Sequence, residues 1–245
     1  MKDLEARQRA REWFHGLTAL PGAWIVIRVD GRSFSRYTEE RFDKPFDARF
    51  SELMTGTASA LLTEFDARYA YTESDEISVL LDPSFSLFGR SVEKLVSLSA
   101  AVASASFTLA AGETVHFDSR LWLGNDTTDV LDYFTWRQAD AARCALNGWC
   151  YWTMRDNGSS RAEATKALER TTTAAKNELL FGHGVNFNEV PAWQRRGVGL
   201  TWETVERPGF DPVRQVEVTA TRRRVRVDRD LPMRDAYRDY VRRML

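Results

Sequence analysis

The sequence contains few cysteines and histidines. Its 245 residues include 2 cysteines and 3 histidines, and the histidines are scattered along the chain. Cys144 and Cys150 lie on one expected helix, at a spacing that turns their side chains to different faces, so we expect neither a disulfide nor a metal cluster. Free thiols of this kind are typical of a reducing compartment, and a cytoplasmic location is therefore expected.

Long apolar runs are also scarce. The most apolar one, Leu98–Ala111, is interrupted by serines and is expected to form a buried helix rather than a membrane span. The first residues, MKDLEARQRAREWF, are charged throughout and are not expected to form a signal peptide. The sequence therefore predicts no membrane partner.

Neither sign of charge is in excess. The chain has 34 Lys and Arg against 35 Asp and Glu, which gives a formal net charge of -1. This balance excludes a uniformly basic nucleic-acid-binding protein, so any site for a polyanion must be a local patch. The clearest patch is TATRRRVRV near the C-terminus, whose expected RNA-binding residues are Arg222, Arg223 and Arg224.

The hydrophobic pattern predicts one α+β domain. Hydrophobic residues make up 43% of the chain, enough for a substantial core. AWIVIRV, residues 23–29, is typical of a central buried strand, and a helix with Asp47 as its N-cap follows. ARYAY and ISVLL are expected to form an antiparallel hairpin with TESDE at its turn. The other expected elements are helices near 92–110, 129–154 and beyond 171, and strands near 114–123, 197–205 and 214–227.

Three acidic residues are expected to meet at one edge of the sheet. A strand–helix–strand crossover would make the first two strands parallel and neighbouring, which brings Asp30 close to Asp75 and Glu76. Two like charges ~4 Å apart repel by about 4 kcal/mol at an intermediate dielectric, so such a cluster needs a proton, a cationic side chain or a metal. Carboxylate oxygens suit Mg²⁺. Glu73, in the same turn, is expected to be solvated and without a role.

Possible phosphate ligands follow the first acid. Gly31 permits a close approach of the backbone, and Arg32, Ser33 and Ser35 add hydrogen-bond donors. Further cations that can neutralise a triphosphate are Lys44, Arg90 and Lys94.

A series of motifs follows in a defined order along the chain: RVDGRSFSRY, FDKPFD, YTESDEISVLL, FDSR, DYFTWRQAD, KNELLF and VNFNEVP. Their order and spacing resemble the tRNA-histidine guanylyltransferase family, which includes guanylyltransferase-like 3′–5′ polymerases. The resemblance implies a polymerase-palm-like (ferredoxin-like) α+β fold with an antiparallel or mixed sheet and helical elaborations. It implies a single catalytic domain over residues 1–245, with a palm core at about 22–140 and a helical and basic strand region at about 141–245.

The same resemblance implies a Mg²⁺-dependent nucleotidyltransferase that acts on the 5′ end of tRNA. ATP or GTP activates the 5′ end, and the 3′-hydroxyl of an incoming nucleotide, typically GTP, then attacks it. Family members typically form tetramers. The expected partners are therefore tRNA, ATP, GTP and further copies of the chain in a homotetramer.

Site residues are carried over position by position. The resemblance implies two Mg²⁺ ions on Asp30, Asp75 and the Gly31 carbonyl, with Glu76 beside them, and these three acids are the expected catalytic residues. The positions matched to nucleotide binding or activation are Arg32, Ser33, Phe34, Ser35, Lys44, Asp47, Ser74, Lys94, Lys176, Asn177, Glu178 and Asn186.

The sequence departs from the family pattern at three positions. The histidine of the family's His-Ile-Asn-Asn-Leu-Tyr-Asn motif is Ala142, the histidine after the phosphate-loop phenylalanine is Ser35, and the asparagine of Lys-Pro-Asn-Asp is Phe46. These changes favour templated repair of 5′-truncated tRNA, with dedicated guanylate addition to tRNA-histidine as the alternative. A nucleotide cyclase-like enzyme on the same palm geometry and a non-catalytic RNA-binding module are further alternatives.

Overall fold

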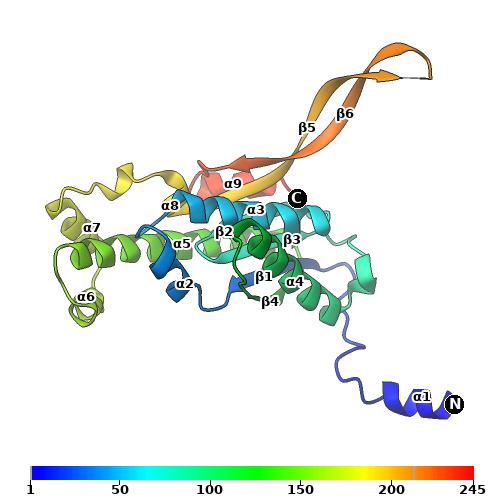
Figure 1. Cartoon of the computed structure of the whole chain (residues 1–245), viewed down its shortest axis with the longest axis horizontal. Helices are drawn as coiled ribbons and strands as arrows, with labels where there is room; N and C mark the ends of the chain where they lie inside the picture. Colours follow the sequence, from blue (N-terminus) through cyan, green and yellow to red (C-terminus); the bar gives the residue numbers. More distant parts are fainter. Residues whose placement is uncertain (1, 212) are drawn as a thin grey trace.

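The computed structural model describes residues 2–211 and 213–245. An antiparallel sheet of strands of unequal length forms the centre of this part of the chain, in the order β4-β1-β3-β2-β5-β6 (Figure 1). The strands are β1 (Trp24–Gly31), β2 (Tyr69–Glu73), β3 (Glu76–Leu81), β4 (Phe117–Gly124), β5 (Val198–Asp211) and β6 (Val216–Asp228).

Helices cover both faces of the sheet. Helices α3 and α4 lie on one face, and α5 and α9 lie on the other. The helices are α1 (Lys2–Arg9), α2 (Phe34–Arg41), α3 (Ala48–Glu64), η1 (Leu87–Arg90), α4 (Val92–Ala111), α5 (Thr127–Asp156), α6 (Arg161–Leu168), α7 (Thr173–Gly182), η2 (Phe187–Glu189), α8 (Ala192–Arg196) and α9 (Asp235–Arg242).

Strand β1 contributes to both layers of the core, as its continuous apolar sequence predicts. Ile25, Ile27 and Val29 pack in the layer under α3 and α4, whereas Trp24 and Val26 pack in the layer under α5 and α9. Side chains alternate between the faces of a strand, so a strand buried on both faces must be apolar at every position in the core.

The order β1-α3-β2-β3-α4-β4 with the spatial order β4-β1-β3-β2 is the ferredoxin-like arrangement, which confirms the predicted palm-like α+β class. One detail of the prediction was wrong. Strands β1 and β2 are parallel, but they are not neighbours, because β3 lies between them and is antiparallel to both. The tight turn after β2 returns the chain at once, and β3 takes the place beside β1.

Helix α4 is, within the described residues, the one helix that is long and apolar enough to cross a membrane by length and composition. It packs on α3 and β4 along one face. Its serines serve this contact, because Ser99 shares a hydrogen bond with Ser119 of β4 at 2.7 Å and Ser104 accepts one from the Phe117 backbone at 3.0 Å. The expectation of a buried helix is therefore confirmed for one face only, where Leu95, Ser99, Ala103 and Phe107 are buried.

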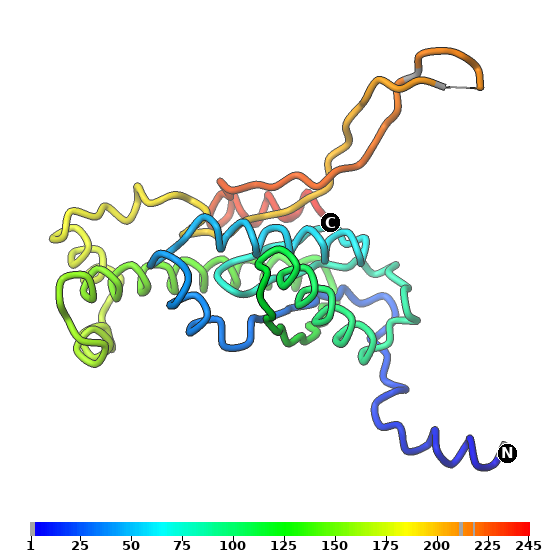
Figure 2. The backbone as a smooth tube through the Cα atoms, viewed as in Figure 1, coloured from blue at the N-terminus to red at the C-terminus, as the bar shows by residue number. Residues whose placement is uncertain are grey.

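Strands β5 and β6 form a two-stranded arm that leaves the body of the protein (Figures 1 and 2). Only residues 198–201 of β5 pair with β2, and the rest of β5 pairs with β6 alone. The base of the arm is attached by Trp202, whose indole Nε1 donates to the Ala67 carbonyl at 2.8 Å. The arm carries the basic patch that the sequence predicts.

Arg90 is a structural residue in this fold, contrary to the prediction that it neutralises a triphosphate. It is buried, and all three guanidinium nitrogens donate to backbone carbonyls at 2.7 to 3.3 Å. The accepting residues are Ala19, Leu20, Ala23, Pro83 and Phe85. These contacts join the segment before β1 to the loop after β3 and leave no nitrogen for a ligand.

Replacement of Arg90 by Met should lower the free energy of unfolding by about 3 kcal/mol, because it leaves several carbonyls without a donor. Urea unfolding measures this. Lys94→Met is the matched control: Lys94 is exposed on the first turn of α4, and its replacement should change stability by less than about 0.5 kcal/mol. Unchanged stability in Arg90→Met, with weaker GTP binding, would contradict the structural role.

Candidate active site

The pairing of β1 with β3 brings the predicted acids to one edge of the sheet. Asp30 lies directly opposite Glu76, and the Gly31 amide donates to the Asp75 carbonyl at 3.0 Å. Asp75 follows Ser74 in a two-residue turn between the paired Glu73 and Glu76. Ser74 has a φ of 48°, which a tight reversal of this kind requires.

Gly31 is required by the packing of the next helix. A Cβ atom at this position would lie 2.5 Å from the ring of Phe34. That ring is buried among Phe107 and Phe117, with centroid distances of 5.2 and 5.0 Å. The Phe34 side chain is therefore part of the core.

The loop between β1 and α2 and the first turn of α2 hold three of the predicted phosphate ligands. Arg32, Ser33 and Ser35 are exposed, and Ser33 has a left-handed backbone with a φ of 63°. The Arg32 amide donates to the His116 carbonyl at 2.9 Å, which fastens the loop to the segment before β4. The loop therefore directs polar side chains to solvent next to Asp30.

The two carboxylates closest to this loop disfavour each other's charge. Burial raises the pKa of Asp75, and the nearby Asp30 raises it further. The pKa of Asp30 is raised by burial and then by Asp118, which lies opposite it on β4. In the described part of the chain neither carboxylate has a salt bridge, so the pair has the electrostatic character of a cation site.

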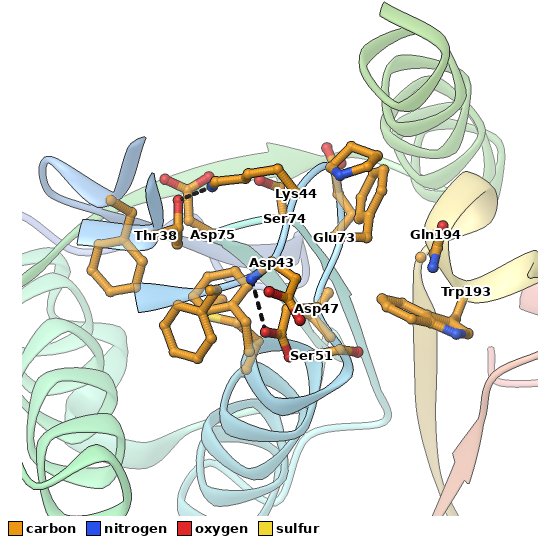
Figure 3. Close-up of a pocket in the computed structure, with 18 of the residues that line it drawn as sticks. Thr38, Asp43, Lys44, Asp47, Ser51, Glu73, Ser74, Asp75, Trp193 and Gln194 are labelled. Carbon is orange, nitrogen blue, oxygen red and sulfur yellow. Dashed lines mark hydrogen bonds between the residues drawn. The ribbon is translucent and has the colours of Figure 1, made fainter. Parts of the chain in front are cut away.

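A cavity of about 370 Å³ opens beside Asp75 (Figure 3). Lys44 projects into it, donates to the Thr38 hydroxyl at 2.7 Å and lies 5.8 Å from the ring centroid of Trp152. Burial lowers the pKa of Lys44, while Asp75 is one of the acids that raise it. The lining combines aromatic rings and several hydroxyls with one lysine and five acids, which are Glu39, Asp43, Asp47, Glu73 and Asp75. Aromatic surface with a few polar groups is typical of a small-molecule site.

Asp47 lies at the floor of this cavity and caps α3. Its carboxylate accepts from the Arg49 amide at 2.7 Å and from the Asp43 amide at 3.0 Å. The Arg49 guanidinium on the same carboxylate, together with these amides, holds the pKa of Asp47 well below its usual range. The predicted N-cap is thus present. The Asp47 carboxylate also holds the loop that carries Lys44, through its hydrogen bond from the Asp43 amide.

Glu76 and Glu73 are both bound to Arg137 of α5, a residue that the sequence analysis did not single out. Arg137 donates to both oxygens of Glu76, at 2.7 and 2.8 Å, and to Glu73 at 3.1 Å. The prediction that Glu73 is solvated was wrong: burial, followed by the charge of Glu76, raises its pKa to about 8. The geometry does not favour Glu76 as a metal ligand, because its oxygens are already engaged.

The residues matched to the K-N-E and N-x-N motifs line a second cavity of about 810 Å³, which shares no lining residue with the first. Lys176, Asn177, Glu178 and Asn186 come together there, and Ala142 lies in the same wall. Its cationic side chains outnumber its single acid, and they are Arg143, Lys176, Arg195 and Arg234. Five of the predicted nucleotide ligands line neither of these cavities: Gly31, Arg32, Ser33, Arg90 and Lys94.

The basic patch of the arm is partly neutralised. Arg224 pairs with Glu203 across the strands at 2.6 Å. Arg223 pairs with Asp66 at 3.1 Å and covers the ring of Trp202 at 4.1 Å, which adds to the attachment of the arm. Arg222 is exposed on the opposite face of β6 from Arg223.

Two family models match most of the chain. The model described as tRNAHis guanylyltransferase matches residues 7–135, and the model described as Thg1 C terminal domain matches residues 128–235. A probable tRNA(His) guanylyltransferase of Mus musculus is 34% identical over 210 residues, which cover 80% of this chain and 70% of the relative. The chain belongs to the tRNA-histidine guanylyltransferase family.

Other members of the family agree with this assignment. A probable tRNA(His) guanylyltransferase of Dictyostelium discoideum is 36% identical, over 73% of this chain and 75% of the relative. A solved bacterial Thg1-like protein in complex with GTP superposes with a TM-score of 0.77 at 25% identity, over 99% of this chain and 98% of that one. The solved tRNA(His) guanylyltransferase of Saccharomyces cerevisiae superposes with a TM-score of 0.73 at 27% identity, over 87% of this chain and 94% of that one. Membership confirms the predicted nucleotidyltransferase class.

Removal of the Asp47 cap should lower the free energy of unfolding by about 1–2 kcal/mol in Asp47→Ala near pH 7. Because folding depresses the pKa of Asp47, this contribution is complete above the ordinary value of 3.8 and declines as the pH falls below it. Urea unfolding of wild type and variant at several pH values tests both statements. Asp43→Ala, in the same loop, is the control, and a difference that persists unchanged at acid pH would contradict the assignment.

Proposed function

We propose that this chain adds a guanylate from GTP to the 5′ end of tRNA-histidine, in the 3′–5′ direction and with Mg²⁺ as cofactor. The observation that carries this proposal is the meeting of Asp30 and Asp75, two carboxylates without a salt bridge in the described chain, beside a cavity that contains Lys44. The relatives named above carry the name of this activity.

The residues present fit Mg²⁺. Among the described residues no group of three His, Cys, Asp or Glu side chains could enclose a metal, so the site offers two carboxylates only. Mg²⁺ is usually bound by one or two carboxylates together with substrate phosphates, and the raised pKa values of Asp30 and Asp75 support a need for positive charge between them. Asp30, Asp75 and the Gly31 carbonyl would hold it. When bound, Mg²⁺ would neutralise phosphate charge and activate an attacking oxygen.

The first cavity is proposed as a nucleotide site. Lys44 can bind a phosphate without breaking a salt bridge, because in the described chain it donates only to a hydroxyl, that of Thr38. Trp152 and Trp193 provide aromatic surface in the same lining. Solved bacterial relatives are described as complexes with GTP and with ATP, and we propose both nucleotides as ligands here.

The proposed reaction has two steps. ATP activates the 5′-monophosphate of the tRNA by transfer of an adenylyl group with release of pyrophosphate. The 3′-hydroxyl of GTP then attacks the activated phosphorus, and AMP leaves as the new phosphodiester bond forms. In this scheme Lys44 binds a phosphate oxygen, and Asp30 and Asp75 would hold the cation beside it.

Templated repair of a 5′-truncated tRNA is the second candidate. It is favoured by Ala142, which stands in the wall of the second cavity where guanylyltransferases proper have a histidine. It is also favoured by Phe46, which replaces the asparagine of the family motif and whose ring centroid lies 6.1 Å from that of Trp193. The names of the curated relatives favour guanylate addition to tRNA-histidine. The two activities differ in whether a base must lie opposite the added nucleotide.

An assay with labelled GTP and two acceptors separates them. Intact tRNA-histidine should become labelled at its 5′ end, and Asp75→Asn should reduce the rate by about 100-fold or more. A 5′-truncated tRNA that is labelled only when the opposing base is cytidine would indicate repair. Equal labelling by wild type and Asp75→Asn would refute the catalytic assignment, and GTP turnover without RNA would indicate a cyclase-like enzyme.

The arm is proposed to contact RNA phosphates. Replacement of Arg222, Arg223 and Arg224 by Gln should weaken tRNA binding about equally for all sequences, because phosphate contacts carry no base information. The slope of log affinity against log salt should fall by about 1 for each phosphate that is no longer neutralised. Filter binding at several salt concentrations measures this, and Arg36→Gln on α2 is an exposed control. An unchanged slope would exclude the arm from the RNA interface.

A further inference from the structure

Arg137 joins the two ends of the turn that carries Asp75. It is buried on α5, and its Nε and Nη2 donate to the two oxygens of Glu76 at 2.7 and 2.8 Å. Nη2 also donates to Glu73 at 3.1 Å, and Nη1 donates to Asp140 at 3.2 Å. Because Glu73 and Glu76 are the paired residues on either side of the turn, one guanidinium spans its base.

The turn has little freedom once its ends are held. It contains two residues, Ser74 and Asp75, so fixing Glu73 and Glu76 leaves few conformations for the backbone between them. The Gly31 amide on the Asp75 carbonyl and the Thr72 hydroxyl on the Glu76 carbonyl add restraints from β1 and β2. Of these restraints, Arg137 is the one that bonds to side chains at both ends.

Arg137 also determines which acids are free of a salt bridge. Besides Asp118 of β4, four carboxylates lie at this edge of the sheet, from Asp30, Glu73, Asp75 and Glu76. Arg137 pairs with Glu73 and Glu76, and Arg28 lies 3.6 Å from Glu76. Asp30 and Asp75 remain. Without Arg137, Glu76 would keep only its longer contact with Arg28 and would stand directly opposite Asp30 as a further ligand.

We propose that Arg137 is a positioning residue for the cation site: by holding Glu73 and Glu76 it orients Asp75 and restricts the carboxylate ligands to Asp30 and Asp75. This inference rests on the proposed cation-dependent function. In this proposal Arg137 does more than neutralise charge, because its planar guanidinium binds Glu73 and Glu76 at the same time and so fixes both ends of the turn.

The test compares catalysis with direct cation binding. In Arg137→Met, kcat for guanylate transfer should fall about 100-fold, the effect of a misplaced ligand. Mn²⁺ binding, measured by electron paramagnetic resonance, should not weaken and should become about tenfold tighter, because Glu76 becomes available to the ion. Parallel loss of both properties, in proportion to loss of folded protein by circular dichroism, would overturn the proposal.

Two further variants keep the test decisive if Arg137→Met folds poorly. The double variant Arg137→Met/Glu76→Gln removes one of the two buried acids that lose Arg137, so it should fold better than the single variant and lose the gain in Mn²⁺ affinity while kcat stays low. Full recovery of kcat would overturn the proposal, because it would show that Arg137 only neutralises Glu76. Arg137→Lys keeps the charge without the fork and should lower kcat about tenfold, whereas wild-type kcat would also overturn the proposal.

Asp75→Asn separates this inference from the proposed function. Wild type should bind Mn²⁺ and Asp75→Asn should bind it at least about tenfold more weakly. If the two bind Mn²⁺ equally, the cation site itself is wrong. If they differ as expected but Arg137→Met matches wild type in both kcat and Mn²⁺ binding, the inference alone fails.

Discussion

The antiparallel pairing of β1 with β3 is the constraint on which the site depends. It places Asp30 opposite Glu76 and lets the Gly31 amide bond to the Asp75 carbonyl, so the two carboxylates meet through backbone hydrogen bonds and not through a flexible loop. The register is secured by the core, because a shift of one residue would turn Ile25, Ile27 and Val29 to the wrong face. The core packing that stabilises the sheet therefore also fixes the geometry of the site.

Charge is organised in pairs around this register. Glu73 and Glu76 are matched by Arg137, and Asp118 is matched by Arg120 at 2.9 Å. Two acids, Asp30 and Asp75, are left without such a partner in the described chain, although burial makes an unpaired charge costly. This imbalance is confined to one edge of the sheet in a chain whose formal net charge is -1.

Much of the fold could be predicted from the sequence, because its helices and strands have the expected apolar periods. The convergence of Asp30 with Asp75 was also predictable, since a crossover places both at one edge. The insertion of β3 between β1 and β2 was not, because strand order depends on tertiary pairing and leaves no local pattern. The roles of Arg90 and Arg137 were hidden for the same reason: a buried arginine and a surface arginine look alike until their acceptors, which lie up to 71 residues away, are known.

The two-residue turn between β2 and β3 has a consequence for how the length of such a chain can vary. One extra residue between Glu73 and Glu76 would move Asp75 out of register with Gly31 and separate the two acids that share Arg137. Insertions and deletions among homologous chains should therefore be absent from this turn.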